Sequence, residues 1–503
     1  MARRRLQLSA RPDGDELRAR FAQIRSELGV PTDFPPEVLR EADVSARRGP
    51  EPGEDLRGVA FVTIDPPGST DLDQALHLER DGDGYRVDYA IADVPGFVDP
   101  GGALAAETLR RVQTLYAPDG RTPLHPPVLS EDAASLLPDR DRPAIVWRFR
   151  LDATGEVERV DVVRALVRSR RQLDYAGVQE RADRAVAARG QSGRDAGDGA
   201  DLADEVAVLL GEVGRLRQAL ERARGGANLP LPDQEVEAGP DGYRLRLRPN
   251  LPCEEWNAQI SLMTGMAAAS LMLDGGVGIL RTMPAAAPEA LAAFRHQAEA
   301  LGADWPAGQT YGVFLDGLDA ARPAHLALLH EAGSLFRGSG YTAFDAAPPA
   351  ATLHAAVAAP YAHVTAPLRR LVDRFALACC LALAAGRPVP GWVCDGLGAL
   401  PDRMRAGDSL AGELERRCVE AVGLALMTGR EGEVFDAVVI DVAGSNTTGS
   451  NTTGAQPSRA GRVQLADPPV LARCEGPVRL GEAVRVRLAP GAPAAGGVRF
   501  VPA

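Results

Sequence analysis

Residues 61–76 constrain the fold of this chain more than any other stretch. The apolar, β-branched run at 61–64 predicts a strand that ends at Asp65, because two prolines and a glycine follow it. The chain then presents Asp71 and Asp73 two residues apart, so an extended segment would point both side chains to one side. Since Asp65 can fold back towards them, three carboxylates are expected to converge near an apolar strand.

Converging carboxylates repel one another, and a like-charged pair about 4 Å apart costs about 4 kcal/mol at an effective dielectric constant of 20. A divalent cation removes that cost, and hard oxygen ligands favour Mg²⁺ or Mn²⁺. Asp-rich turns after strands are also common as solvated loops or helix caps. Spacing alone therefore leaves both a metal site and an ordinary turn open.

The same stretch, together with residues 89–94, resembles the first motif of the ribonuclease II (RNB) family of exoribonucleases. In that family an Asp cluster holds Mg²⁺ on the scissile phosphate. The resemblance implies Asp65, Asp71 and Asp73 as metal ligands, with Asp73 also counted as catalytic. The family commonly has a fourth Asp where this chain has Gln74, whose amide oxygen can ligate a hard metal but adds no charge.

Residues 108–119 and 130–138 resemble the next motifs of the family. There, the tyrosine that matches Tyr116 stacks on a base beside the reacting phosphate, and stacking is worth roughly 1–3 kcal/mol per base. The resemblance therefore implies that Tyr116 binds RNA and takes part in catalysis. The residues alone favour a half-buried loop aromatic instead.

An apolar helix is predicted to begin at Glu254 and Glu255. Acidic residues at a helix N-terminus gain about 0.3–1 kcal/mol from the helix dipole, which is a sufficient structural reason for the pair. In the family, a Glu-Glu pair opens the matching helix and one member contributes to catalysis. Glu255 aligns best with that member.

The second strong motif surrounds Pro367, a residue that suits the first position of a helix. Arg369 is then expected in the first helical turn, where free backbone N–H groups already favour an anion. A cation at that place is poorly positioned unless it serves an anionic ligand, so phosphate binding is the better interpretation. The motif resembles the family's, in which the first Arg stabilises the phosphate, and Arg369 and Arg370 are implied as RNA-binding residues. His363 is expected to be a hydrogen-bonded structural residue.

A chain of 503 residues is long enough for more than one domain. The expected fold class is α+β and multidomain, with an RNB catalytic domain at 56–427 in which helices surround a mixed sheet. Short alternating strands between Gly/Pro turns predict an OB-fold RNA-binding barrel at 428–503. Residues 1–55 are expected to form a small helical or winged-helix accessory that ends in a linker over 45–56.

Composition excludes several classes of protein. The sequence contains Arg but no Lys, which rules out Schiff-base chemistry and a P-loop lysine. The six cysteines lack paired spacing, which fits a reducing cytoplasm, and no apolar run is long enough to span a membrane. The net charge of −12 argues against long non-specific binding to duplex DNA, although Arg can still line a local RNA channel.

We therefore predict a cytoplasmic, monomeric 3′→5′ exoribonuclease that degrades single-stranded RNA processively to nucleoside 5′-monophosphates. The resemblance implies two Mg²⁺ ions about 4 Å apart, with Mn²⁺ as a substitute. Two alternatives stay open. One is a catalytically impaired RNB-fold RNA-binding protein whose site Gln74 disables, and the other is a metal-dependent endonuclease that uses the same carboxylates.

Overall fold

The structure, a computed structural model, describes residues 14–51, 53–192, 201–239, 242–442, 458–490 and 497–503. At its centre is a mixed six-stranded sheet in the order β1-β8-β2-β3-β4-β7, in which β7 also pairs with β8. β1 and β2 run parallel to β8, and the other neighbours are antiparallel. The strands are β1 (Glu54–Asp55), β2 (Phe61–Ile64), β3 (Gln74–Asp81), β4 (Gly84–Ala92), β7 (Asp141–Leu151) and β8 (Val157–Leu173).

The strand predicted at 61–64 is confirmed as β2, and apolar residues of β2 and β4 form the core of the sheet. All four residues of β2 are buried, and β4 is buried over most of its length. The segment between β4 and β7 holds shorter elements that lead to the candidate site. They are α3 (Val94–Phe97), α4 (Ala103–Arg111), β5 (Leu115–Ala117), β6 (Gly120–Thr122) and the π-helix η1 (Leu129–Ala133).

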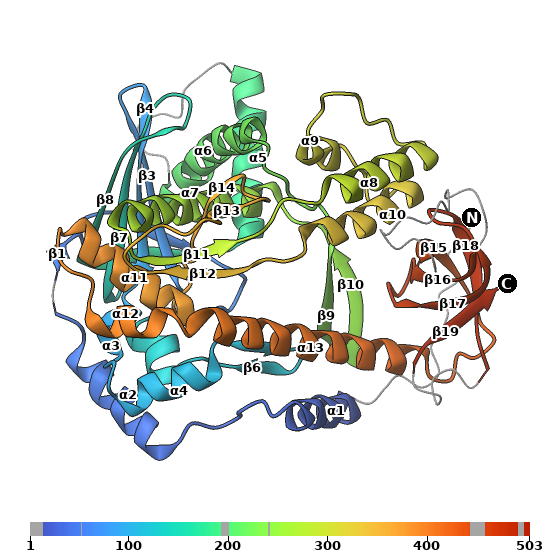
Figure 1. Cartoon of the computed structure of the whole chain (residues 1–503), viewed down its shortest axis with the longest axis horizontal. Coiled ribbons are helices and arrows are strands. Elements are labelled where there is room, and N and C mark those ends of the chain that lie inside the picture. Colours follow the sequence, from blue (N-terminus) through green and yellow to red (C-terminus); the bar gives the residue numbers. More distant parts are fainter. Residues whose placement is uncertain (1–13, 52, 193–200, 240–241, 443–457, 491–496) are drawn as a thin grey trace.

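Helices α5 to α7 lie together beside the sheet, and α11 packs against α7 and β8 (Figure 1). The helix predicted to begin at Glu254 is confirmed, with its first residue at Pro252. Residues of the sheet and of these helices share one large apolar cluster. The helices are α5 (Tyr175–Ser192), α6 (Leu202–Arg224), α7 (Pro252–Gly275), α11 (Leu371–Ala384) and α12 (Gly391–Leu397). In the described part of the chain, no helix is long and apolar enough to cross a membrane.

Helix α13 (Leu400–Met427) runs from the central domain to the C-terminal barrel (Figure 1). The predicted five-stranded barrel is confirmed, since the strands close in the order β15-β16-β17-β19-β18. Its strands are β15 (Val434–Val442), β16 (Ser458–Leu465), β17 (Leu471–Val478), β18 (Ala483–Leu488) and β19 (Arg499–Pro502). Beside the barrel lies a small helical unit with its own aromatic core, made of α8 (Pro288–Ala300), α9 (Tyr311–Asp316), α10 (Pro323–Ala332) and the 3-10 helix η2 (Gly333–Phe336).

Four strand pairs complete the description outside the main sheet and the barrel. One is the β5–β6 hairpin, and another is a hairpin of β9 (Asp233–Gly239) and β10 (Gly242–Arg248). The other two pairs are β11 (Gly278–Thr282) with β12 (Gly340–Phe344), and β13 (Leu353–His354) with β14 (Ala359–Pro360).

The N-terminal region consists of α1 (Gly14–Glu27) and α2 (Pro36–Arg48), as the helical spacing predicts. Over the described residues before 56 the single strand is β1, which joins the central sheet, so this part of the structure shows helices without a β-wing. The linker predicted for 45–56 is wrong in part. α2 continues to Arg48 because Ser45 is buried and its hydroxyl donates to the carbonyl of Phe97, and the pairing of β1 with β8 orders residues 54 and 55.

Candidate functional site

The loop from the end of β2 to the start of β3 carries the predicted carboxylates. Asp73 is the most deeply buried of them, with 3% of its surface exposed. Its Oδ1 accepts a hydrogen bond from the backbone N–H of Leu368 at 2.8 Å, and its Oδ2 lies 3.4 Å from Nε of Arg369. Burial raises the pKa of Asp73 to about 8, although the charge of Arg369 and the hydrogen bond from Leu368 oppose that rise.

Asp65 ends strand β2, and its backbone N–H donates to the carbonyl of Leu173 at 3.1 Å. Its Oδ2 is buried without a hydrogen-bond partner among the described residues. Burial, helped by the charge of Asp71, raises the pKa of Asp65 to about 6, while Arg369 lowers it. A buried carboxylate oxygen without a donor is costly, so this atom is suited to receive a proton or a cation.

Asp71 is held by Arg121, a residue that the sequence reasoning missed. The Arg121 guanidinium forms an ion pair with Asp71, donates to Thr70 Oγ1 at 2.7 Å and lies 2.9 Å from Glu131 Oε1. Arg121 faces Tyr116 across the β5–β6 hairpin. The Asp-Gly pair at 119–120 is a hairpin signal that could have placed Arg121 opposite Tyr116.

Gln74 begins β3, and its side-chain amide nitrogen donates to the backbone carbonyl of Thr365. This bond orients the amide, because the nitrogen must face Thr365. It also joins the Asp loop to the segment that carries Arg369. An Asp at this position would lose that donor.

Arg369 and Arg370 do not lie in a helix, so the predicted helical position of Arg369 is wrong. Residues 367–369 form a turn, Arg370 is extended with φ −135° and ψ 126°, and α11 begins at Leu371. The backbone explains this, because the N–H of Leu371 donates to the carbonyl of Val112 at 2.9 Å instead of continuing a helix. The guanidinium of Arg369 is presented by a turn, and the helix N-terminus argument does not apply to it.

The two arginines have different surroundings. The side chain of Arg369 is 49% exposed, and its one ion-pair contact within the described chain is the 3.4 Å approach to Asp73. Arg370 instead makes two hydrogen bonds of 2.9 Å to the fully buried Asp373, which also accepts from the N–H of Ala366. Arg369 is therefore free to meet a ligand, whereas the donors of Arg370 hold the turn in place.

Tyr116 projects from β5 and is 51% exposed, one of few large apolar side chains at the surface of the described chain. Partial burial of its hydroxyl and the nearby charge of Asp71 raise the pKa of Tyr116, and Arg369 and Asp73 also act on it electrostatically. The structure therefore brings Tyr116, Asp71, Asp73 and Arg369 together.

Among the described residues, Glu255 makes its side-chain hydrogen bond to α6 and none to these carboxylates. Its Oε2 accepts a hydrogen bond from Gln218 of α6 at 2.9 Å, and burial, with Asp316 and Glu254 nearby, raises the pKa of Glu255. Glu254 pairs with Arg248 and caps α7 through the N–H of Leu251. The dipole interpretation of this acidic pair accounts for its position.

Tyr175 is a second aromatic residue at the site that the sequence reasoning missed. It begins α5 directly after β8, and burial together with the charge of Asp65 raises its pKa to about 12. Its hydroxyl lies 3.5 Å from Nδ2 of Asn257 on α7. Tyr175 follows the end of β8, which runs parallel to β2, so it lies at the same edge of the sheet as Asp65. Only the sheet topology shows this, because the two residues are far apart in the sequence.

His363 is hydrogen-bonded, as predicted, through Nδ1 to the hydroxyl of Tyr341 at 2.8 Å. Burial and the neighbouring arginines Arg370 and Arg281 keep its pKa well below the usual value. A neutral, hydrogen-bonded imidazole fits a structural role.

The donor set at the Asp loop is made of oxygen atoms, which suits Mg²⁺ or Mn²⁺, and the unpartnered Oδ2 of Asp65 is suited to a cation. Within the described residues, however, no three His, Cys, Asp or Glu side chains are already arranged around a common point as metal ligands. Arg121 accounts for part of this, because it occupies an oxygen of Asp71. The chemistry fits a hard cation, and Asp71 would have to share that oxygen or turn its other one inward.

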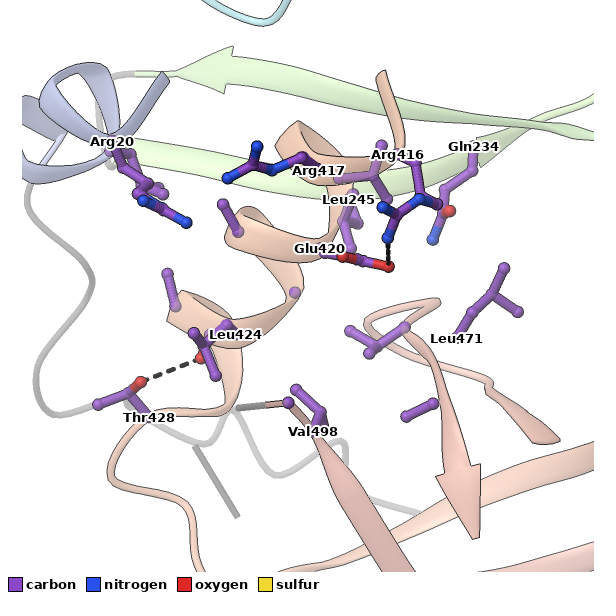
Figure 2. A pocket seen from close by; sticks show the side chains of 18 of the residues that line it. Arg20, Gln234, Leu245, Arg416, Arg417, Glu420, Leu424, Thr428, Leu471 and Val498 are labelled. Atoms are coloured by element: carbon purple, nitrogen blue, oxygen red, sulfur yellow. Dashed lines mark hydrogen bonds and ion pairs between the residues drawn. The ribbon is translucent and has the colours of Figure 1, made fainter. Parts of the chain in front are cut away.

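A large cavity lies elsewhere, between α1, α13, the β9–β10 hairpin and the barrel (Figure 2). It has a volume of about 1220 Å³, and none of the predicted site residues lines it. Its walls carry aliphatic side chains, several arginines and three glutamates, without an aromatic ring. Although the cavity is large, it is not the candidate catalytic site, because the predicted site residues lie elsewhere.

Comparison with known proteins agrees with the fold. The RNB domain family matches residues 53–378, and the RNase II-type exonuclease C-terminal S1 domain matches residues 433–503. The chain is 35% identical over 149 residues to a probable exosome complex exonuclease RRP44 of Caenorhabditis elegans, covering 29% of this chain and 16% of that protein. It is 33% identical over 162 residues to Ribonuclease R of Thermotoga maritima, covering 31% of this chain and 23% of that protein. The chain thus matches less than a quarter of the length of either relative.

Solved structures share the fold at low sequence identity. Mycoplasma genitalium RNase R, in complex with ribose methylated single-stranded RNA, has a TM-score of 0.82 at 15% identity, covering 97% of this chain and 78% of that chain. Yeast Ssd1, a pseudonuclease, has a TM-score of 0.63 at 14% identity, covering 87% of this chain and 52% of that chain. With the family match over residues 53–378 and the closed barrel that follows it, the chain belongs to the RNB family and ends in an RNase II-type S1 domain.

Proposed function

We propose that this chain is a metal-dependent 3′→5′ exoribonuclease that hydrolyses single-stranded RNA processively to nucleoside 5′-monophosphates. The observation that carries the proposal is the half-exposed Arg369 beside the buried Asp73, with the exposed ring of Tyr116 nearby. A cation and an aromatic face that meet solvent next to buried carboxylates suit a ligand that has both a phosphate and a base.

In this proposal the exposed guanidinium of Arg369 binds the phosphate next to the RNA terminus and stabilises the charge that develops on it. Tyr116 stacks on the terminal base, and Arg370 holds the turn that presents Arg369. Asp65, Asp71, Asp73 and the amide oxygen of Gln74 would hold Mg²⁺ or Mn²⁺, which when bound lowers the pKa of a water and neutralises phosphate charge. The family resemblance alone supports a catalytic role for Glu255.

The proposed division of labour follows the predicted boundaries. Residues 56–427 would carry the chemistry, and residues 428–503 would bind RNA that leads into the site. Residues 1–55 would be an accessory region.

The experiment that tests this function uses a 5′-labelled single-stranded RNA of about 30 nucleotides with Mg²⁺, analysed on a denaturing gel against an EDTA control. We expect stepwise loss of nucleotides from the 3′ end, accumulation of a short 5′-labelled core, and no reaction in EDTA. Internal cuts from the first time points would instead identify an endonuclease.

Two observations favour a second candidate, a catalytically impaired RNA-binding protein. Asp71 already forms an ion pair with Arg121, and Gln74 adds no charge to the site. Retention of intact RNA in a gel shift, with no shortening in either Mg²⁺ or Mn²⁺, would establish this candidate and contradict the exonuclease.

The outer face of the barrel supports its role in RNA binding. Arg462 of β16 faces Arg473 of β17, and Arg473 pairs in register with Arg499 of β19. Glu475 lies within 3.7 Å of Arg473 and 3.9 Å of Arg499, and Asp441 of β15 is in register with Arg462, so two carboxylates offset part of the positive charge of this row of three arginines. Like charges directly opposite in a sheet are destabilising unless an anion bridges them, and an RNA backbone supplies such anions.

Replacing Arg462 and Arg473 together by Ala is expected to weaken RNA binding in a salt-dependent way. The slope of log K against log salt concentration should become less steep by about 0.7 for each phosphate that is no longer neutralised, so by about 1.4 for the pair. Fluorescence anisotropy with labelled single-stranded RNA in EDTA measures this slope. Arg485→Ala is the matched control, because Arg485 lies on β18 outside the row and is 74% exposed. An unchanged slope in the double variant would remove the row from the RNA path.

A further inference from the structure

The N-terminal helix α1 reaches the candidate site through one ion pair. Arg25, in the last turn of α1, donates to both carboxylate oxygens of Asp119 at 2.6 and 2.7 Å, across 94 residues of sequence. Their side chains are only 18% and 13% exposed. A two-pronged, partly buried Arg–carboxylate pair fixes both distance and orientation, unlike an exposed single contact.

Asp119 lies in the turn between β5 and β6, and this hairpin carries two residues of the candidate site. Tyr116 and Arg121 face each other across it. Tyr116 is the proposed base-stacking residue, and Arg121 forms an ion pair with Asp71. The Arg25 contact therefore holds the tip of the hairpin whose sides meet the carboxylates.

The opposite face of the same hairpin packs on α13, the helix against which α1 also packs. Leu115 is 3% exposed and shares an apolar cluster with Phe21 and Ile24 of α1 and with Leu414 of α13. Because side chains alternate along a strand, burying Leu115 turns its neighbour Tyr116 outward. α1 lies along α13 (Figure 1), so α1 reaches the hairpin through α13 as well as through the Arg25–Asp119 ion pair.

The segment that leads into the hairpin also bonds to the turn that presents Arg369. The N–H of Thr114 donates to the carbonyl of Arg369 at 3.0 Å, and Gln113 forms a β-bridge with Arg370. The chain that leaves α1 is fastened as well, because the buried Arg111 donates to the carbonyl of Pro31 at 3.2 Å. α1, the hairpin and the Arg369 turn thus form a continuous set of contacts.

We propose that α1 is a brace for the β5–β6 hairpin, and that Arg25 and Asp119 are positioning residues which hold Tyr116 ready to stack on the terminal base of the RNA. This inference rests on the proposed function. Without the ion pair the hairpin tip is free, and binding RNA must then order it, which weakens affinity by about two- to tenfold. The chemistry at Asp73 is not altered by this loss, so KM should rise while kcat stays within about twofold.

The test measures stacking directly. The probe is a single-stranded RNA with 2-aminopurine as its 3′-terminal base, bound to Asp73→Asn protein so that it is not consumed, and the readout is quenching of the probe together with its Kd. Tyr116→Ala in this background sets the signal without stacking. We expect Arg25→Ala and the isosteric Asp119→Asn each to lose part of the quenching and to raise Kd by about two- to tenfold.

The charge exchange of Arg25→Asp combined with Asp119→Arg should restore quenching and Kd towards the parent values, which general damage to the fold would not do. Arg20→Ala is the matched control, because Arg20 lies on the same helix and its ion pair is with Glu27 of that helix. Parent-like quenching and Kd in Asp119→Asn, whose shape is unchanged, would overturn the brace. Failure of the exchange to recover what both single variants lose would overturn it too. A parent protein that binds no RNA would overturn the proposed function itself.

Discussion

Asp73→Asn is expected to reduce kcat for hydrolysis of single-stranded RNA by about 10³-fold or more. Asn keeps the size of the side chain, and its carbonyl can still accept the hydrogen bond that Leu368 gives to Asp73 at 2.8 Å. What disappears is the carboxylate oxygen 3.4 Å from Nε of Arg369, which would carry a negative charge when a divalent cation is bound. The loss should therefore be in catalysis and not in folding.

The measurement is single-turnover hydrolysis of labelled RNA with saturating Mg²⁺, alongside the Kd of the same RNA in EDTA. The Kd should stay within a few-fold of wild type, because Tyr116 and Arg369 remain in place. Asp395→Asn is a matched control, since Asp395 lies on α12 outside the site. Activity of Asp73→Asn within tenfold of wild type would remove Asp73 from the metal site.

The same variant has an expected signature in stability. Asp73 has a pKa of about 8 in the folded, metal-free protein and about 3.9 when unfolded. Between these values the folded protein holds a proton that the unfolded chain has released, so this group's contribution to stability falls as pH rises from about 4 to about 8. Asn does not titrate, so in EDTA the Tm of Asp73→Asn should gain on wild type between pH 6 and pH 8. If the Tm values of wild type and Asp73→Asn change with pH in parallel, burial does not raise the pKa of Asp73.

The second large effect is a division of roles between adjacent arginines. Arg369→Ala is expected to lower kcat by about 10²- to 10³-fold, because it removes a half-exposed cation beside Asp73 that is placed to stabilise charge on the phosphate. Its cost in stability should stay below about 1 kcal/mol, since the side chain is 49% exposed and its contact with Asp73 is long. Arg369→Lys keeps the charge but not the planar fork, so it should recover only part of the activity.

Arg370→Ala, in contrast, is expected to have its larger effect on stability. It leaves the fully buried Asp373 without its ion-pair partner, which typically costs about 3–5 kcal/mol, so the free energy of unfolding should fall by that amount. Urea unfolding in EDTA measures both variants, and single-turnover kinetics separates their effects on chemistry. An Arg369→Ala protein that is fully active but unstable would contradict this division.

Much of the fold follows from local sequence. The strand at 61–64, the helical N-terminal region, the helix near residue 254 and the C-terminal barrel are all predicted by spacing and turn residues. Each depends on residues near one another in the chain, where side-chain periodicity and backbone preference decide. The Asp residues and the two arginines were also proposed from sequence as site residues, because the motifs that resemble the RNB family are contiguous.

Tertiary contacts decided the rest. The helix expected at Pro367 begins at Leu371, because the N–H of Leu371 pairs with the distant carbonyl of Val112. Arg121 binds Asp71 from 50 residues away, and Glu255 accepts a hydrogen bond from Gln218 of α6. The sequence alone indicated which carboxylates, arginines and aromatic residues could form the site, because each of them lies in a local motif. Which partner each charge meets was set by packing between distant segments, since a charge pairs with whatever the fold places within hydrogen-bond reach.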